Sequence, residues 1–131
     1  MDQPQRTRKI RRGEIFWLPD CPPLDGRGAK ARPIVVLGEF IKGGKPLLIV
    51  AISHTASQPE RDPDMIRLPD LQQSPQVKTG LNKPSWAIPR WWAVVSPERL
   101  GASVGYLSGD SLRKLIVAVT KRVDAANRLL P

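Results

Sequence analysis

The sequence has very few residues that bind metals or act as strong nucleophiles. Its 131 residues include one cysteine, Cys21, and one histidine, His54. One cysteine cannot form an internal disulfide, which favours a reducing compartment. No zinc-ligand cluster and no calcium loop is present, so we expect no metal. A nucleophilic pair of Cys21 with His54 is an alternative that no surrounding motif supports.

Long apolar runs and nucleotide-binding loops are missing as well. No run approaches the roughly 20 apolar residues that span a bilayer. The basic N-terminus has no apolar core of the kind found in secretory signals. The sequence contains neither a glycine-rich phosphate loop nor a dinucleotide fingerprint. We therefore expect a cytoplasmic protein that needs no cofactor and contacts no membrane.

What the sequence has in excess is positive charge. Twenty-one Lys and Arg residues against twelve Asp and Glu give a net charge of +9, with an isoelectric point near 10.5. This balance favours a polyanionic partner, which is RNA, DNA or an acidic protein. Simple solubility is the alternative reading of the charge.

The chain is punctuated by 14 prolines and 10 glycines, which favours short strands and turns. Residues 1–12 form a basic arm in this reading, and residues 13–131 form a single domain. A long loop is expected from Pro19 to Ala31, and a hairpin turn at 42–45. The expected strands are 15–18, 33–40, 46–53, 65–68, 85–89, 91–95 and 102–107.

The C-terminal part has a different periodicity. Apolar residues recur at helical spacing from Leu112 to Leu130. This pattern predicts an amphipathic helix over 109–130, with Ser108 as its N-cap and Asp110 near the positive end of its dipole. Short links between strands imply antiparallel pairing. We expect a small, partly closed β-barrel, mainly β, with one helix laid on it.

Polar residues occur where the predicted strands end. If 33–38 and 47–53 pair through the 42–45 turn, Arg32 lies beside Ser53 and His54. Arg32 would then clamp a phosphate, Ser53 would donate to it, and His54 would move a proton. This grouping suits metal-free phosphoryl transfer within RNA. The plainer alternatives are a solvated arginine, a surface histidine and a turn serine.

Four tryptophans offer two uses. They could stack on unpaired bases, or they could fill the core, which is the commoner use in small barrels. Trp91 and Trp92 are adjacent and therefore face opposite sides of a strand.

Five segments in order resemble the PemK/MazF-type toxins of bacterial toxin–antitoxin systems. The resemblance spans about residues 11–130 and rests on RRGEIFWLP, ARPIVVL, LLIVAISHT, KTGLNKPSWAIPR and GYLSGDSLRKL. It implies an SH3-like barrel of the MazF/CcdB kind. It also implies a homodimeric, sequence-specific endoribonuclease that cleaves single-stranded RNA without metal and leaves a 2′,3′-cyclic phosphate and a 5′-OH. An acidic antitoxin would silence this enzyme.

The resemblance also assigns residues. Arg32 matches the family's catalytic arginine and Ser53 its catalytic Thr or Ser, while His54 falls on the adjacent position. Substrate contacts are expected from Glu14 in the first strand, and from Lys30 and Thr55 beside the catalytic positions.

The sequence departs from the family pattern at two places. The loop before Arg32 reads DGRGAKA and carries no glutamate or histidine directly before the arginine, and Ser85 and Ala87 replace an Arg-x-Asp pair. These departures motivate a second hypothesis. It is a non-catalytic barrel that binds nucleic acid or poisons a protein, as the CcdB-type gyrase poisons do.

Overall fold

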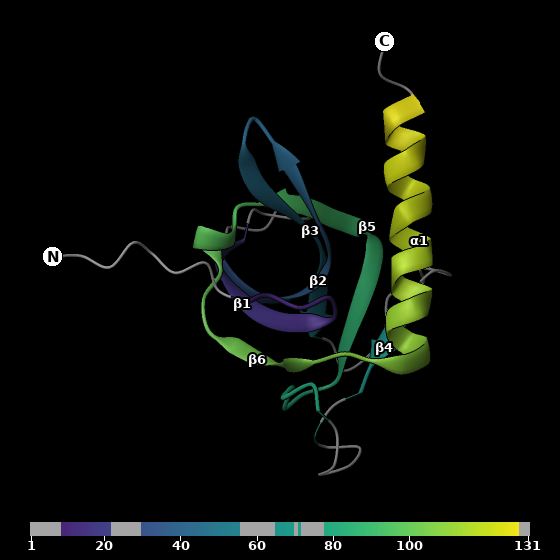
Figure 1. Ribbon diagram of the computed structural model, residues 1–131. Coiled ribbons are helices and arrows are strands. Elements are labelled where there is room, and N and C mark those ends of the chain that lie inside the picture. Colours follow the sequence, from purple (N-terminus) through teal and green to yellow (C-terminus); the bar gives the residue numbers. More distant parts are fainter. Residues whose placement is uncertain (1–8, 22–29, 56–64, 70, 72–77, 129–131) are drawn as a thin grey trace, which may run out of the picture.

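The computed structural model describes residues 9–21, 30–55, 65–69, 71 and 78–128. Its sheet has six strands in the order β4-β5-β3-β2-β1-β6, and every pairing is antiparallel. The helix α1 stands beside this curled sheet, against β5 and β4 (Figure 1). The elements are β1 (Glu14–Cys21), β2 (Lys30–Lys42), β3 (Lys45–Thr55), β4 (Ile66–Leu68), β5 (Ser85–Val95), the 3₁₀ turn η1 (Pro97–Arg99), β6 (Ser103–Tyr106) and α1 (Gly109–Arg128).

The two faces of the sheet bury two separate apolar clusters, because successive side chains of a strand point to opposite faces. We call one the inner face; its buried residues include Phe16, Leu18, Ile34, Val36, Val50, Ile52, Ile88 and Trp91. The other is the helix face, whose cluster includes Ile15, Val35, Ala51, Ala87, Leu115 and Val119. Trp91 and Trp92 belong to different clusters, which confirms that they face opposite ways.

The first strand is longer than predicted. It runs through Pro19 to Cys21, and β2 begins as early as Lys30. The pairing of β1 with β2 is irregular between Leu18 and Cys21, and a proline is tolerated at such a bulge because no ladder hydrogen bond is lost there. The prediction that Pro19 ends the strand and opens a long loop was therefore wrong. Residues 22–29 of that loop lie outside the described residues.

The hairpin between β2 and β3 is confirmed at 42–45. Lys42 pairs with Lys45, and Gly43 and Gly44 have φ of 61° and 76°. Positive φ at both central residues is typical of the turn whose twist matches a hairpin, and glycine adopts it without steric cost.

The predicted bend near Pro89 is also present. The structure has one strand at 85–95, but its pairing with β3 jumps from Trp92 opposite Ala51 to Ala87 opposite Ser53. The expected strands at 65–68 and 102–107 are slightly shorter in the structure.

The predicted helix is confirmed over Gly109–Arg128, while 129–131 lie outside the described residues. Leu115 and Val119 are buried on the helix face. Within the described part of the chain, no helix combines the length and apolarity that crossing a membrane requires.

Candidate functional site

Arg32 is the least expected buried residue of the sheet. It lies near the start of β2, opposite Leu18 of β1, and only 4% of it is exposed. A buried guanidinium is costly unless an anion or hydrogen-bond acceptors satisfy it. Among the described residues, none forms a hydrogen bond or an ion pair with its side chain. A guanidinium has the planar geometry that matches a carboxylate or a phosphate.

A row of polar and aromatic positions crosses the sheet at this strand end. The ladder between β2 and β3 ends with Ile34 opposite Ile52, and extending this register by two residues sets the position of Arg32 opposite that of His54. His54 pairs with Trp86 of β5, which pairs with Arg67 of β4. Directly paired positions share a face, so the four positions form one row on the inner face. The side chain of His54 lies outside the described part of the structure.

The far end of this row contains a cation–π contact. The guanidinium carbon of Arg67 lies 5.2 Å from the centre of the Trp86 ring. The indole Nε1 of Trp86 is buried and has no hydrogen-bond partner among the described residues. A buried donor of this kind usually has a partner, so a ligand acceptor would complete it. We refer to Arg32, His54, Trp86 and Arg67 as the strand-end row.

Ser53 lies next to the row but on the other face. It pairs with Ala87, and its hydroxyl donates a 3.0 Å hydrogen bond to the carbonyl of Pro33. The strand ends are adjacent as predicted, yet alternation directs Ser53 and Arg32 to opposite faces of the sheet. The single hydroxyl proton of Ser53 is committed to Pro33, so donation to a phosphate requires this bond to break. Its catalytic role stays a prediction.

Glu14 lies at the other end of β1. It is buried, and its two carboxylate oxygens accept hydrogen bonds from the Arg11 amide (3.1 Å) and the Ser103 hydroxyl (2.8 Å). In the register of β1 and β2 it lies opposite Val36, four residues or about 13 Å along the strand from Arg32. The structure therefore does not bring Glu14 to the strand-end row, and its visible role is to hold β1 to β6.

The other predicted substrate contacts are located only by their backbones. Lys30 pairs with Cys21, and Thr55 pairs with Ser85, so both positions flank the strand-end row. Their side chains lie outside the described part of the structure.

Cys21 is fully buried on the inner face near Arg32. Burial raises the pKa of its thiol, although the positive charges of Arg32 and Arg99 oppose that shift. The thiolate is the reactive form, so a buried thiol with a raised pKa is a poor nucleophile at neutral pH. This disfavours the Cys21–His54 pair. Across the described ranges, no group of three or more His, Cys, Asp and Glu side chains could hold a metal ion.

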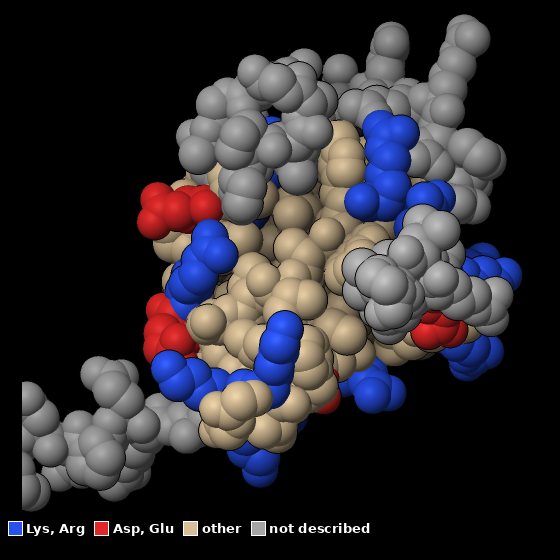
Figure 2. Space-filling view, turned by 90° about the horizontal axis from the view of Figure 1, so that it is seen from above, with Lys and Arg blue, Asp and Glu red and all other residues tan. Residues whose placement is uncertain are grey.

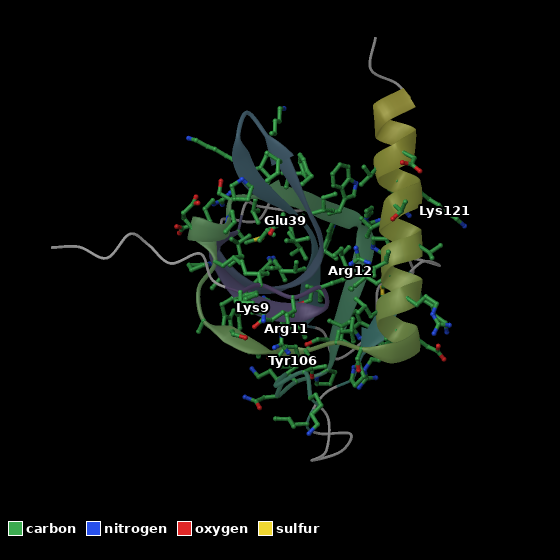
Figure 3. The ribbon with its side chains drawn as sticks, in the orientation of Figure 1. Lys9, Arg11, Arg12, Glu39, Tyr106 and Lys121 are labelled. Atoms are coloured by element: carbon green, nitrogen blue, oxygen red, sulfur yellow. The ribbon has the colours of Figure 1, made fainter. Side chains whose placement is uncertain are left out.

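Basic side chains are spread over the surface. Figure 2 shows Lys and Arg around the face seen from above, with fewer acidic groups. At another part of the molecule the basic residues Lys9, Arg11 and Arg12 lie in the segment that directly precedes β1 (Figure 3). The positive charge is thus not confined to the strand-end row, and a polyanion would meet favourable potential over much of the surface.

The fold and this site define a basic, SH3-like small β-barrel with arginines and a tryptophan at one strand end. The chain belongs to the PemK-like, MazF-like toxins of type II toxin–antitoxin systems, whose family profile matches residues 11–122. The predicted resemblance is therefore confirmed. Such a toxin has an antitoxin as its partner.

Solved structures show the same fold. The Mycobacterium tuberculosis toxin MazF-mt6 superposes with a TM-score of 0.57 at 21% identity, covering 85% of this chain and 96% of that one. An endoribonuclease from a mycobacterial species superposes with a TM-score of 0.55 at 11% identity, covering 92% and 96%. These likenesses confirm the predicted small barrel. No curated protein matches the sequence.

Proposed function

We propose that this toxin is an endoribonuclease that cleaves single-stranded RNA in the cytoplasm without a metal ion. The observation that carries the proposal is the buried Arg32 near the strand end at which His54 pairs with Trp86 and Trp86 pairs with Arg67. An arginine matches phosphate geometry, and an aromatic ring at the same strand end suits an unpaired base.

The proposed reaction is an internal transfer of the phosphoryl group. The ribose 2′-oxygen attacks the adjacent phosphorus and loses its proton, while the bond from phosphorus to the 5′-oxygen breaks and that oxygen gains a proton. The products are a 2′,3′-cyclic phosphate and a 5′-OH. Arg32 would neutralise charge on the non-bridging oxygens in the transition state. His54 would move the protons, because imidazole is the side chain that most often serves as general acid and base.

The test is end-group analysis of RNA incubated with the pure protein in excess chelator. We expect cleavage at a limited set of sites, with the upstream fragment resistant to polyadenylation until its cyclic phosphate is removed. The downstream fragment should accept a phosphate at its 5′ end without prior dephosphorylation. Intact RNA across diverse sequences would contradict the proposal and favour the alternative, a barrel that binds nucleic acid or poisons a protein such as gyrase.

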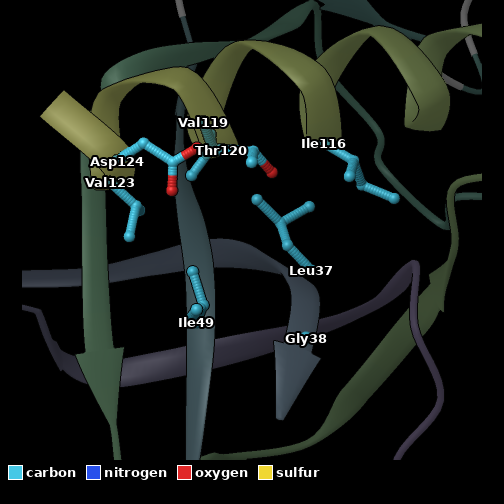
Figure 4. A pocket seen from close by; sticks show the side chains of 8 residues that line it. All are labelled: Leu37, Gly38, Ile49, Ile116, Val119, Thr120, Val123 and Asp124. Carbon is cyan, nitrogen blue, oxygen red and sulfur yellow. The ribbon is translucent and has the colours of Figure 1, made fainter. Parts of the chain in front are cut away.

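A second proposal concerns the apolar groove between α1 and the β2–β3 hairpin. Two adjoining pockets of about 250 and 440 Å³ share Ile49 and Val123. In Figure 4 side chains of α1 face Leu37 and Ile49 across this groove. At its rim Phe40 and Val94 are 36% and 42% exposed. We propose that a second copy of the chain covers this groove, because homodimer interfaces are more apolar than the rest of the surface. The acidic antitoxin would bind the basic regions instead.

The homodimer proposal predicts a solution mass of twice 14.5 kDa by light scattering. Phe40→Asp should shift the protein towards the monomer, because the new carboxylate would be desolvated in the interface. Val117→Asp is the control, since Val117 is an exposed α1 residue that does not line the groove. A wild-type mass of one chain, or equal dissociation by both variants, would contradict the proposal.

A further inference from the structure

A third pocket of about 310 Å³ opens at the same strand end as Arg32, but on the helix face. Its walls are mostly apolar, and two exposed polar side chains, Asn82 and Lys83, stand among them. Trp17 is one of the lining residues and is 41% exposed. The lining residues are Trp17, Pro33, Gly80, Leu81, Asn82, Lys83, Ser85 and Val104. Apolar walls with a few convergent polar groups are typical of small-ligand sites.

The rim of this pocket is held in place by hydrogen bonds on both sides. The Thr79 hydroxyl donates to the Pro69 carbonyl (2.6 Å) and accepts from the Leu81 amide (3.2 Å). The Tyr106 amide donates to the Lys78 carbonyl (2.8 Å), which ties the segment to β6. The Ser85 hydroxyl donates to the Lys83 carbonyl (2.9 Å). The segment 78–85 therefore forms a fixed wall, so little ordering is needed when a ligand binds.

The pocket and the strand-end row are built from neighbouring residues. Pro33 follows Arg32, and Ser85 precedes Trp86. Trp17 pairs with Pro33 as Leu18 pairs with Arg32. Because adjacent strand residues face opposite sides, the pocket lies directly behind the row, across one thickness of the sheet.

We propose that this pocket holds one unpaired base of the RNA, next to the nucleotide whose phosphate is bound by Arg32. The inference rests on the proposed function and adds a specificity site to it. Trp17 supplies a face on which any base can stack. The Asn82 amide and the Lys83 ammonium offer donors and an acceptor to the edge of the base, which gives the site a means of preferring one base. Lys83 also places positive charge where the chain of phosphates must pass.

The experiment uses an RNA that contains the cleavage site mapped above, with a 2′-deoxyribose at the cut to remove the nucleophile. Binding of this RNA is measured for the wild type and for Trp17→Ala, each with a series of single abasic positions. We expect Trp17→Ala to weaken binding of the intact RNA by about 5- to 150-fold. One abasic position next to the cut should weaken wild-type binding by a similar factor and have no further effect in Trp17→Ala.

Three variants, each compared with the wild type, report on the roles of the pocket's side chains. Trp17→Phe should retain most of the affinity because it keeps an aromatic face. Tyr106→Ala is the matched control, since it removes an exposed aromatic ring that does not line the pocket. Asn82→Ala should relax the preference for one base in the cleavage motif. Lys83→Ala should weaken binding of all RNA sequences and lower the salt dependence of binding. Lys121→Ala, at an exposed residue of α1, should have a smaller effect on both quantities.

The possible failures separate the two proposals. One outcome is that the wild type cleaves RNA while, at every position, the abasic change weakens binding by the same factor in Trp17→Ala as in the wild type. In that case the pocket holds no base, and the nuclease proposal stands. If Trp17→Ala binds as tightly as the wild type, the pocket proposal is likewise overturned. If the wild type neither binds nor cleaves RNA, both proposals fail.

Discussion

Replacing Arg32 with methionine is expected to lower the rate of RNA cleavage by about 10³-fold or more, while the protein remains folded. The guanidinium would stabilise charge that develops on the phosphate oxygens, and methionine cannot do so. Methionine does replace the apolar stem of Arg32 in its buried position. Exchanging a buried charge for an apolar side chain of similar size is often neutral or stabilising, so the melting temperature should stay equal or rise. Initial rates on a mapped RNA and a thermal melt measure the two effects.

Two further variants show whether the loss depends on guanidinium geometry or on charge in general. Arg32→Lys keeps the charge but loses the two-pronged contact, so it should also lose most of the activity. Arg113→Ala is the control, because Arg113 is 76% exposed in an ion pair with Asp110 and such surface pairs contribute little. A methionine variant that cleaves at the wild-type rate would overturn the assignment of Arg32. Equal losses in the Arg32 and Arg113 variants would point to net charge instead.

The sheet and the position of Arg32 were predictable because both depend on local patterns. Continuous apolar runs and the Gly43-Gly44 turn between them define β2, β3 and their pairing. Once these strands pair, Arg32 must lie at their open end. The error about Pro19 arose because a proline usually ends a strand, and the sequence carries no signal for the bulge that accommodates it.

The composition of the site was harder to predict because it depends on register across several strands. Arg67 belongs to a three-residue strand whose pairing with Trp86 no local pattern specifies. The face of the sheet on which Ser53 lies could have been predicted from the sequence. Arg32 lies on the same face as Ile52, and Ser53, as the next residue in the strand, points to the opposite face. For Glu14 the family resemblance was the only guide, and it suggested a contact with substrate. In the structure both carboxylate oxygens of Glu14 accept hydrogen bonds from within the fold.

From the sequence, the Thr79-Gly80-Leu81 motif served only as part of the resemblance to the toxin family. The structure shows why the motif contains a glycine. Gly80 has a φ of +71°, and a Cβ at this position would overlap the carbonyl oxygen of Val104. Replacing Gly80 with alanine therefore adds backbone strain to a clash with backbone that cannot rotate away. We expect Gly80→Ala to lower the free energy of unfolding by about 2–3 kcal/mol, measured by urea denaturation.

Gly38→Ala is the matched control, because Gly38 has no atom within 4 Å of an added Cβ and its φ is not positive. It should change the free energy of unfolding by no more than about 1 kcal/mol. Similar values for both variants would show that Gly80 does not pack tightly against the Val104 carbonyl.

The Gly80 variant also tests the base pocket, since Gly80 and Val104 line it together. A base held equally in the ground state and the transition state affects KM and leaves kcat unchanged. At a temperature where Gly80→Ala is still folded, we therefore expect its KM for RNA to rise while kcat stays close to the wild-type value.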